Sequence, residues 1–261
     1  MTVGAVREVK AVLSQPSTQT AKGHFTQSRF GSLRVSVVIP ALNEERSLPL
    51  VLGALPMADL QQVVVADNGS EDGTARVARE GGAEVVLASR RGYGSACLSG
   101  MASLNPADIV VFLDADFSDD PTELPLLVEP ILDGRADLVV GSRSLGDCEK
   151  GAMMPQQRFG NWLATRLVAL FFGHRYTDLG PFRAVTAEAL DRIAMGDLDF
   201  GWTIEMQVRA LQEGLRVEEV PVSYRRRIGV SKITGTVKGT FLAGVKILWT
   251  IFRLRLRGPA S

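Results

Sequence analysis

The stretch IVVFLDADFSDDP, residues 109–121, decides the fold of this chain. Its apolar, partly β-branched residues lead directly into a run of carboxylates, as a buried strand does when it ends at a polar edge. Pro121, directly after Asp119 and Asp120, is a favourable first residue of a helix. The stretch therefore predicts a strand–loop–helix unit of an α/β protein, with its acidic residues in the loop.

Four further apolar runs resemble this strand, at residues 35–40, 63–67, 84–88 and 137–142. They are continuous rather than alternating, which is typical of strands buried on both faces of a parallel sheet. Helical patterns are predicted between the strands, at about residues 45–55, 71–81, 94–104 and 121–133. This alternation predicts an α/β fold with an open, Rossmann-like, mostly parallel sheet and helices on both faces.

The composition is that of an ordinary globular protein and narrows the class of function. Lys plus Arg and Asp plus Glu are 29 each among 261 residues, so net charge does not favour a nucleic-acid partner. The two cysteines form no CxxC pair, which argues against a zinc site and fits a reducing cytosolic setting. Neither a secretion signal nor an apolar run long enough to span a membrane is expected.

Polar motifs follow three predicted strands: PALNEE at residues 40–45, DNGSEDGT at 67–74 and DADFSDD at 114–120. In an open parallel sheet, ligands bind at this carboxyl edge. Asp114 and Asp116 repel each other unless a positive charge lies between them. A hard divalent cation meets that need, and diphosphate oxygens complete its shell. The pair predicts a Mg²⁺ or Mn²⁺ site, with a metal-free acidic loop as the alternative.

Two other segments were candidates for phosphate binding. Asp67 suits a ligand role, but it suits a helix-capping role equally well. There is no GxxxxGK[ST] motif, and the segment RRGYGSA does not match a dinucleotide fingerprint. It does place Arg90 and Arg91 beside a glycine-containing loop, from which they can reach phosphate. Solvated surface arginines are the alternative there.

Seven motifs in order resemble the family 2 glycosyltransferases of the GT-A fold, and most of all the dolichyl- and polyprenyl-phosphate sugar synthases. They are VVIPALNEE, VVADNGSEDGT, RRGYGSACLSG, FLDADFSDDP, DLVVGSR, TDLGPFRA and the GVSK that follows RRRI. The resemblance covers roughly residues 35–232. It implies an inverting, metal-dependent enzyme that moves a sugar from a nucleotide diphosphate sugar to a polyprenyl or dolichyl phosphate.

We expect three parts in such a chain. Residues 1–33 are polar and predict a flexible N-terminal arm. Residues 34–235 predict the GT-A domain, with a nucleotide-binding half over 34–145 and an acceptor half over 146–235. Residues 236–261 predict a C-terminal amphipathic helix and tail.

The motifs assign residues to both substrates. The predicted nucleotide-sugar-binding residues are Pro40, Asn43, Glu44, Asp67, Arg91, Asp114, Ala115 and Asp116, with Asp114 and Asp116 as metal ligands. The predicted acceptor-phosphate-binding residues are Arg143, Arg183, Arg226, Ser231 and Lys232. Asp116, Arg143 and Asp178 are the predicted catalytic residues.

Two positions depart from the family pattern. Asn68 stands where many members have a second aspartate, and Ser118 stands where dolichyl-phosphate mannose synthases usually have glutamine. The second departure disfavours a mannose donor, and UDP-glucose is the first prediction.

The chemistry of the acceptor leaves the role of Asp178 open. A lipid monophosphate has a second pKa near 6, so it is largely dianionic at pH 7 and needs no general base. Asp178 would then orient cations such as Arg143. With a hydroxyl acceptor on a glycan or small metabolite, Asp178 would instead be the base. A third possibility for Asp178 is a purely structural role as the cap of its loop. For the whole chain, a non-catalytic sugar-nucleotide-binding subunit is the remaining alternative.

The tail predicts one helix with two chemically distinct sides. At about 100° per residue, one sector collects the basic residues Lys238, Lys246, Arg253 and Arg257. The opposite side collects Phe241, Val245, Leu248, Ile251 and Phe252. Such a helix is typical of an anionic membrane interface, so we expect peripheral association with the cytoplasmic membrane face. The alternative is packing on the domain or at a contact of a homo-oligomer, with the basic side solvated.

Overall fold

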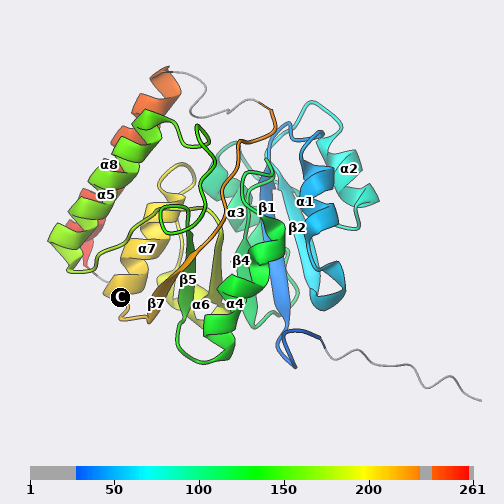
Figure 1. Cartoon of the computed structure of the whole chain (residues 1–261), viewed down its shortest axis with the longest axis horizontal. Helices are drawn as coiled ribbons and strands as arrows, with labels where there is room; N and C mark the ends of the chain where they lie inside the picture. The colour runs from blue at the N-terminus through cyan, green and yellow to red at the C-terminus, as the bar shows by residue number, and fades with distance from the viewer. Residues whose placement is uncertain (1–27, 230–236, 259–261) are drawn as a thin grey trace, which may run out of the picture.

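The computed structural model of the chain describes residues 28–229 and 237–258 (Figure 1). Within these residues, seven strands form one sheet in the order β3-β2-β1-β4-β6-β5-β7. The strands are β1 Val35–Ala41, β2 Gln62–Asp67, β3 Glu84–Leu87, β4 Ile109–Phe112, β5 Leu138–Ser142, β6 Arg183–Thr186 and β7 Val217–Pro221. The sheet is mostly parallel, as predicted, and the expected α/β, GT-A-like class is confirmed.

One strand runs against the others. β6 is antiparallel to both β4 and β5 and separates them, so Arg183 pairs with Phe112 on one side and with Val140 on the other. β1, in contrast, pairs in parallel with β2 and β4. The five predicted strands therefore exist, but β4 and β5 are not neighbours.

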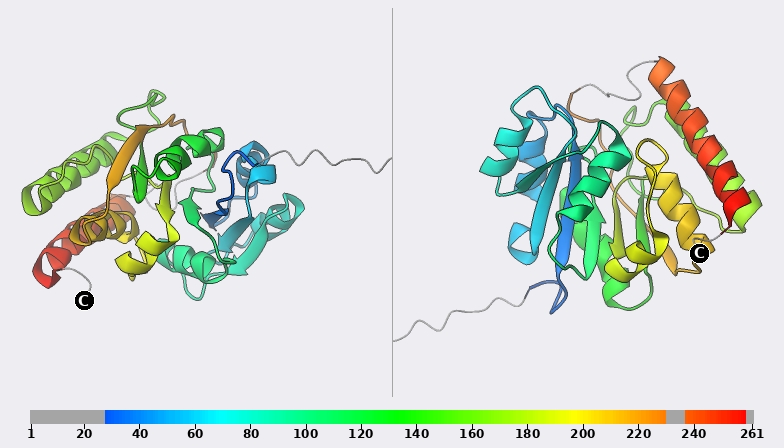
Figure 2. Two further views of the ribbon diagram at one scale, coloured as in Figure 1. Left: turned by 90° about the horizontal axis from the view of Figure 1, so that it is seen from below. Right: turned by 180° about the vertical axis from the view of Figure 1, so that it is seen from behind.

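Helices cover both faces of the sheet (Figure 2). They are α1 Leu48–Ala54, α2 Thr74–Glu80, α3 Tyr93–Ala102, α4 Leu124–Leu132, α5 Pro155–Phe172, α6 Ala187–Ile193, α7 Trp202–Gln212 and α8 Val237–Arg257, with short 3-10 turns η1 Met57–Asp59 and η2 Pro121–Glu123. Val37 and Ile39 of β1 pack with α1, α2 and α4, whereas Val38 packs with α3, α6 and α7. Alternate residues of the central strand thus belong to two separate cores.

Two predicted boundaries moved for local reasons. α1 begins at Leu48 rather than near residue 45, since Asn43 has a left-handed φ of 53° and keeps the preceding loop out of helix. The helix predicted from Pro121 begins there as the 3-10 turn η2, capped by the Asp120 side chain, which accepts a hydrogen bond of 3.1 Å from the Thr122 N–H; the α-helix α4 begins only at Leu124. Phe30, inside the predicted N-terminal arm, is buried in the core, while residues 1–27 lie outside the described residues.

The tail helix is present as α8, but two residues of its predicted basic side, Lys246 and Arg253, turn toward the protein. Lys246 lies 2.9 Å from Asp197, and Arg253 lies 3.5 Å from Glu205. Both carboxylates are buried, so they draw the two cations toward the protein. Val245 and Phe252 are exposed instead. The side chains of Lys238 and Phe241 are outside the part of the chain that the structure describes. Among the described helices, none is long and apolar enough to cross a membrane.

Candidate active site

A cavity of about 320 Å³ opens where β1, β2 and β4 end, at the edge of the sheet that the sequence predicted. Six of the eight predicted nucleotide-sugar-binding residues line it: Pro40, Glu44, Arg91, Asp114, Ala115 and Asp116. The other lining residues are Ala41, Leu42, Asn68, Gly92, Tyr93, Asp199, Phe200 and Arg227. The cavity therefore gathers residues from motifs that are far apart in the sequence.

The two predicted donor residues outside the lining support the loops behind it. The carboxylate of Asp67 accepts a 2.8 Å hydrogen bond from the Ser70 N–H. The side-chain oxygen of Asn43 accepts one of the same length from the Glu71 N–H. Asp67 thus closes the turn after β2 and does not cap α2, whose N-cap is Gly73, so its contact with the nucleotide stays a prediction.

The Asp114 carboxylate is partly buried and accepts a 2.9 Å hydrogen bond from the Tyr93 hydroxyl. Burial first, and then the charge of Asp116, raise the pKa of Asp114 to about 7. The Tyr93 hydroxyl acts in the opposite direction, because it stabilises the ionised carboxylate. Asp114 therefore changes protonation near neutral pH.

The Asp116 carboxylate is fixed from two sides. One oxygen accepts hydrogen bonds from the Ser118 N–H and hydroxyl at 2.9 and 2.5 Å. The other lies 3.0 Å from the Arg227 guanidinium. Ser118, the position that departs from the mannose synthases, therefore orients Asp116. A third acid, Asp119, is buried with neither carboxyl oxygen hydrogen-bonded among the described residues, and burial raises its pKa.

This donor set fits a divalent cation that shares its ligands with a substrate. Asp114 and Asp116 bring two carboxylates together, and repulsion between them favours a bound cation. No group of three or more His, Cys, Asp or Glu side chains suited to a metal occurs in the described part of the chain. A metal held by this pair would need further oxygen ligands, which a diphosphate supplies.

Arg227 is a cavity residue that the sequence analysis missed. Its guanidinium lies 3.3 Å from Glu44 as well as 3.0 Å from Asp116. The predicted neighbour, Arg226, points elsewhere and donates to the Lys150 carbonyl at 2.8 Å. The segment is extended and runs alongside the acidic loop, since the Ile228 N–H donates to the Asp116 carbonyl at 3.0 Å. In extended backbone, adjacent side chains point to opposite sides, and that alternation was the available signal.

The cavity wall formed by Asp199 and Phe200 is attached to α3 and to α8. The Ser95 N–H donates to the Leu198 carbonyl at 2.9 Å. A Cβ at Gly94 would lie 2.0 Å from the Asp197 carbonyl oxygen, so only glycine allows this approach. Because Asp197 also pairs with Lys246, the tail helix supports one wall of the cavity.

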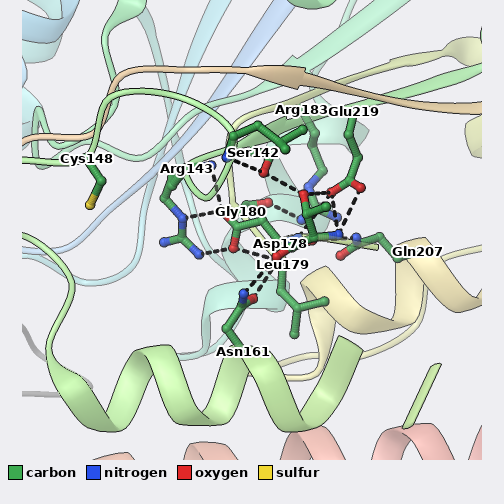
Figure 3. Close-up of polar contacts among 12 residues, drawn as sticks. Ser142, Arg143, Cys148, Asn161, Asp178, Leu179, Gly180, Arg183, Gln207 and Glu219 are labelled. Atoms are coloured by element: carbon green, nitrogen blue, oxygen red, sulfur yellow. Dashed lines mark hydrogen bonds and ion pairs between the residues drawn. The ribbon is translucent and has the colours of Figure 1, made fainter. Parts of the chain in front are cut away.

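Arg143 and Asp178 form a bidentate ion pair (Figure 3), and Arg143 lies near enough to Asp114 to act on its pKa, which it lowers. The Nε and Nη2 atoms of Arg143 each donate to a different Asp178 oxygen at 2.7 Å. The N–H groups of Arg143 and Leu179 add two further hydrogen bonds of 2.8 Å to the same carboxylate. Burial opposes the charge of Arg143, but Asp178 more than offsets this and raises its pKa. This geometry favours the orienting role of Asp178 over the base.

The remaining predicted acceptor residues are not seen at the surface of the site in the described part of the chain. Arg183 has no exposed surface, and it donates to the carbonyls of Thr203 and Gly180 (Figure 3). Burial lowers its pKa. It therefore lies beneath the loop that carries Asp178 and Gly180, and its contact with a phosphate stays a prediction. Ser231 and Lys232 lie outside the described residues.

Comparison with known proteins gives one consistent family. Residues 36–194 match the family model described as glycosyl transferase family 2. An uncharacterized glycosyltransferase of Mycobacterium tuberculosis is 42% identical over 219 residues, which are 80% of this chain and 94% of that protein. The undecaprenyl-phosphate mannosyltransferase of Micrococcus luteus is 31% identical over 246 residues, covering 86% of this chain and 99% of the relative.

A solved structure shares the fold. Glucosyl-3-phosphoglycerate synthase from Mycobacterium tuberculosis, in complex with Mn²⁺, UDP and glucosyl-3-phosphoglycerate, superimposes with a TM-score of 0.70. The sequence identity is 24%, and the match covers 88% of this chain and 82% of that one. The motifs, the family model and the relatives agree: the chain belongs to glycosyltransferase family 2 and is a glycosyltransferase.

Proposed function

We propose that this enzyme transfers a sugar from a nucleotide diphosphate sugar to a polyprenyl phosphate, with inversion at the sugar carbon and with Mg²⁺ or Mn²⁺. The observation that carries the proposal is the proximity of the Asp114–Asp116 pair to the Arg143–Asp178 pair. The charge of Arg143 acts on Asp114, and both pairs act on the buried Asp119 between them in sequence. The first pair suits a metal-diphosphate, and the second pair suits a phosphate nucleophile. The printed name of the Micrococcus luteus relative, an undecaprenyl-phosphate mannosyltransferase, supports the acceptor class.

On the donor side, Asp114 and Asp116 would hold the metal. When bound, the cation would offset the negative charge that builds on the leaving diphosphate. Arg227 already lies 3.0 Å from Asp116 and would add its charge there. Arg91 is 67% exposed at the cavity, where its guanidinium can reach a phosphate oxygen.

On the acceptor side, the protein would position a charged phosphate. A phosphate monoester is largely dianionic above its second pKa of about 6, so no side chain has to remove a proton. Arg143 keeps its Nη1 atom without a hydrogen bond to the described residues, while Nε and Nη2 bind Asp178. We assign Nη1 to the acceptor phosphate and Asp178 to the orientation of Arg143.

The donor sugar is the finer part of the proposal. UDP-glucose remains the first choice, and UDP with Mn²⁺ in the solved glucosyl-3-phosphoglycerate synthase is consistent with it. The Micrococcus luteus relative is named for mannose, which makes a mannose donor the second choice. A peripheral position on the cytoplasmic membrane face belongs to the same proposal, because the phosphate of a polyprenyl lipid lies at the membrane surface.

A donor panel tests the proposal. The purified chain is incubated with Mn²⁺ or Mg²⁺, undecaprenyl phosphate in detergent, and labelled UDP-glucose, GDP-mannose or UDP-N-acetylglucosamine. We expect one donor to label the lipid, and NMR of the product to show a β-linkage from the α-linked donor. An α-linked product would refute inversion. Label on hydroxyl acceptors alone, or no lipid label with any donor, would refute the acceptor class.

A further inference from the structure

Helices α5 and α8 lie side by side at the end of the molecule opposite α2 (Figures 1 and 2). They carry every exposed large aromatic side chain of the described residues. On α8 the exposed apolar residues are Leu242, Val245, Trp249, Phe252 and Leu256, between 45% and 87% exposed. On α5 they are Phe159, Trp162 and Leu170, between 52% and 73% exposed. We name these eight residues the α5–α8 apolar surface.

The surface is one continuous structural unit. At about 100° per residue, its five α8 members fall within a stripe about 80° wide. The rings of Phe171 and Phe252 join the helices at a centroid distance of 5.4 Å. Behind them, Val168 of α5 and Ile251 of α8 share one buried cluster. The exposed side chains therefore sit on a rigid base rather than on a loose tail.

The charged residues of α5 and α8 are all basic. Neither α5 nor α8 contains an Asp or Glu residue. Arg158 and Arg166 on α5, and Arg255 and Arg257 on α8, are exposed around the apolar side chains. Tryptophan and arginine beside aliphatic side chains suit the boundary between anionic headgroups and acyl chains. A second copy of the chain would instead bring like charges together, which disfavours a self-contact.

One side chain of α5 connects this surface to the acceptor side of the site. The Asn161 amide donates to the Thr177 carbonyl at 3.1 Å and accepts from the Leu179 N–H at 2.9 Å (Figure 3). These two contacts flank Asp178, the partner of Arg143. A partner that binds to the outer side of α5 and α8 is therefore separated from the Arg143–Asp178 pair only by helix α5.

We propose that the α5–α8 apolar surface docks on an anionic lipid bilayer and brings the Arg143–Asp178 pair to the level of the headgroups. The docking stands on the exposed aromatic and basic side chains alone. Its use in catalysis rests on the proposed polyprenyl-phosphate acceptor. The tail helix thus contacts lipid through its apolar stripe, while Lys246 and Arg253 remain paired with the protein.

Vesicle binding tests the docking without any substrate. The full chain is sedimented with vesicles of phosphatidylcholine and phosphatidylglycerol, and compared with the double variant Trp249→Ser, Leu256→Ser. These two side chains are 62% and 87% exposed, so the variant should keep the fold, which circular dichroism checks. We expect binding at least tenfold weaker, about 1.4 kcal/mol. Leu87→Ser, 70% exposed on β3, is the matched control and should bind as the native chain does.

Three outcomes separate the possible occupants of the surface. Lipids brominated in the acyl chains should quench Trp162 and Trp249, while Trp202, 1% exposed, serves as the unquenched reference. A native chain that does not sediment, or a double variant that sediments equally, overturns the docking. A native dimer that the double variant splits identifies a self-contact and overturns it as well.

Activity separates this inference from the proposed function. With acceptor in detergent, the double variant should transfer sugar at the native rate, and with acceptor in vesicles it should be at least tenfold slower. Vesicle binding by a native chain that transfers no sugar to any lipid would refute the proposed function and leave the docking intact.

Discussion

The donor and acceptor sides of the site treat charge in opposite ways. On the donor side, burial and then the nearby charge of Asp116 raise the pKa of Asp114 to about 7. On the acceptor side, Arg143 and Asp178 are matched atom for atom at 2.7 Å. Two like charges held close together destabilise the folded chain. In a bidentate ion pair, each charged group instead stabilises the ionised form of its partner. The donor side therefore leaves negative charge for a ligand to neutralise, whereas the acceptor side already pairs the charges of Arg143 and Asp178 with each other.

Removing the donor-side charge should have the largest effect on catalysis. Asp116→Asn takes away a metal ligand and the charge opposite Arg227, so the transfer rate should fall by about 10³-fold. Steady-state kinetics with saturating Mn²⁺ measures this loss. Asp120→Asn is the matched control, because Asp120 lies in the same loop but only caps η2 and pairs with Arg225. A similar loss in both variants would contradict a specific role for Asp116.

Breaking the acceptor-side pair should have the largest effect on stability. Asp178→Asn leaves Arg143 buried without its carboxylate, which costs about 3 kcal/mol, or roughly 6–12 °C in melting temperature. We also expect a higher KM for the acceptor and an unchanged affinity for UDP. A base would behave differently: kcat would fall by orders of magnitude while the KM for the acceptor stayed at the native value.

Arg227 and Arg226 should separate the two substrates. Arg227→Met removes the cation beside Asp116 and Glu44, so the affinity for the nucleotide sugar should fall about tenfold. Arg226→Met should leave donor affinity unchanged, because that side chain contacts Glu149 and the Lys150 carbonyl. Calorimetry with UDP and Mn²⁺ distinguishes the two variants, and equal losses would remove Arg227 from the donor site.

The strain on the donor side should appear in the pH dependence of stability. Between the unfolded pKa of Asp114, about 4, and its folded value of about 7, the unfolded chain releases a proton that the folded chain keeps. Native stability is therefore lost progressively from about pH 4 to 7. The Asp114→Asn side chain does not titrate. The stability of this variant relative to the native chain should therefore rise from about pH 4 to 7 and stay constant above that.

Melting curves without metal measure this relative stability. At pH 8 we expect the Asp114→Asn variant to melt at least about 3 °C above the native chain, equivalent to roughly 1 kcal/mol. Mn²⁺ with UDP should reverse this order, because only the native chain keeps both carboxylates. An advantage that shrinks from pH 4 to 7 would show that the carboxyl group is not destabilised by burial.

The smallest expected effect concerns the support of the cavity wall. Lys246→Met releases Asp197, which holds the loop carrying Asp199 and Phe200, so donor affinity should fall about threefold with kcat unchanged. Lys246→Arg should restore affinity. Arg255→Met, an exposed cation on the same helix, is the control. A drop in kcat without a change in donor affinity would place the role of Lys246 elsewhere.

The sequence located the acids at the strand ends better than the cations around them, for a physical reason. Asp114 and Asp116 follow a buried strand directly, so strand periodicity and local charge locate them. In the segment after β7, successive side chains alternate between the cavity and the opposite side. An error of one residue in the expected register therefore exchanges Arg226 for Arg227. The inward turn of Lys246 depends on Asp197, and no local pattern in α8 reveals a buried carboxylate from another element.

The position of β6 has a consequence for how the chain is made. β5 cannot join the sheet through β4, because β6 must lie between them. While the ribosome is still adding residues before Arg183, the strands β3, β2, β1 and β4 can already pair, but β5 has no partner and β4 presents an open edge. A chain interrupted there would expose a template for aggregation. The donor and acceptor sides of the site are therefore joined in one sheet only after the antiparallel strand β6 has been synthesised and has paired.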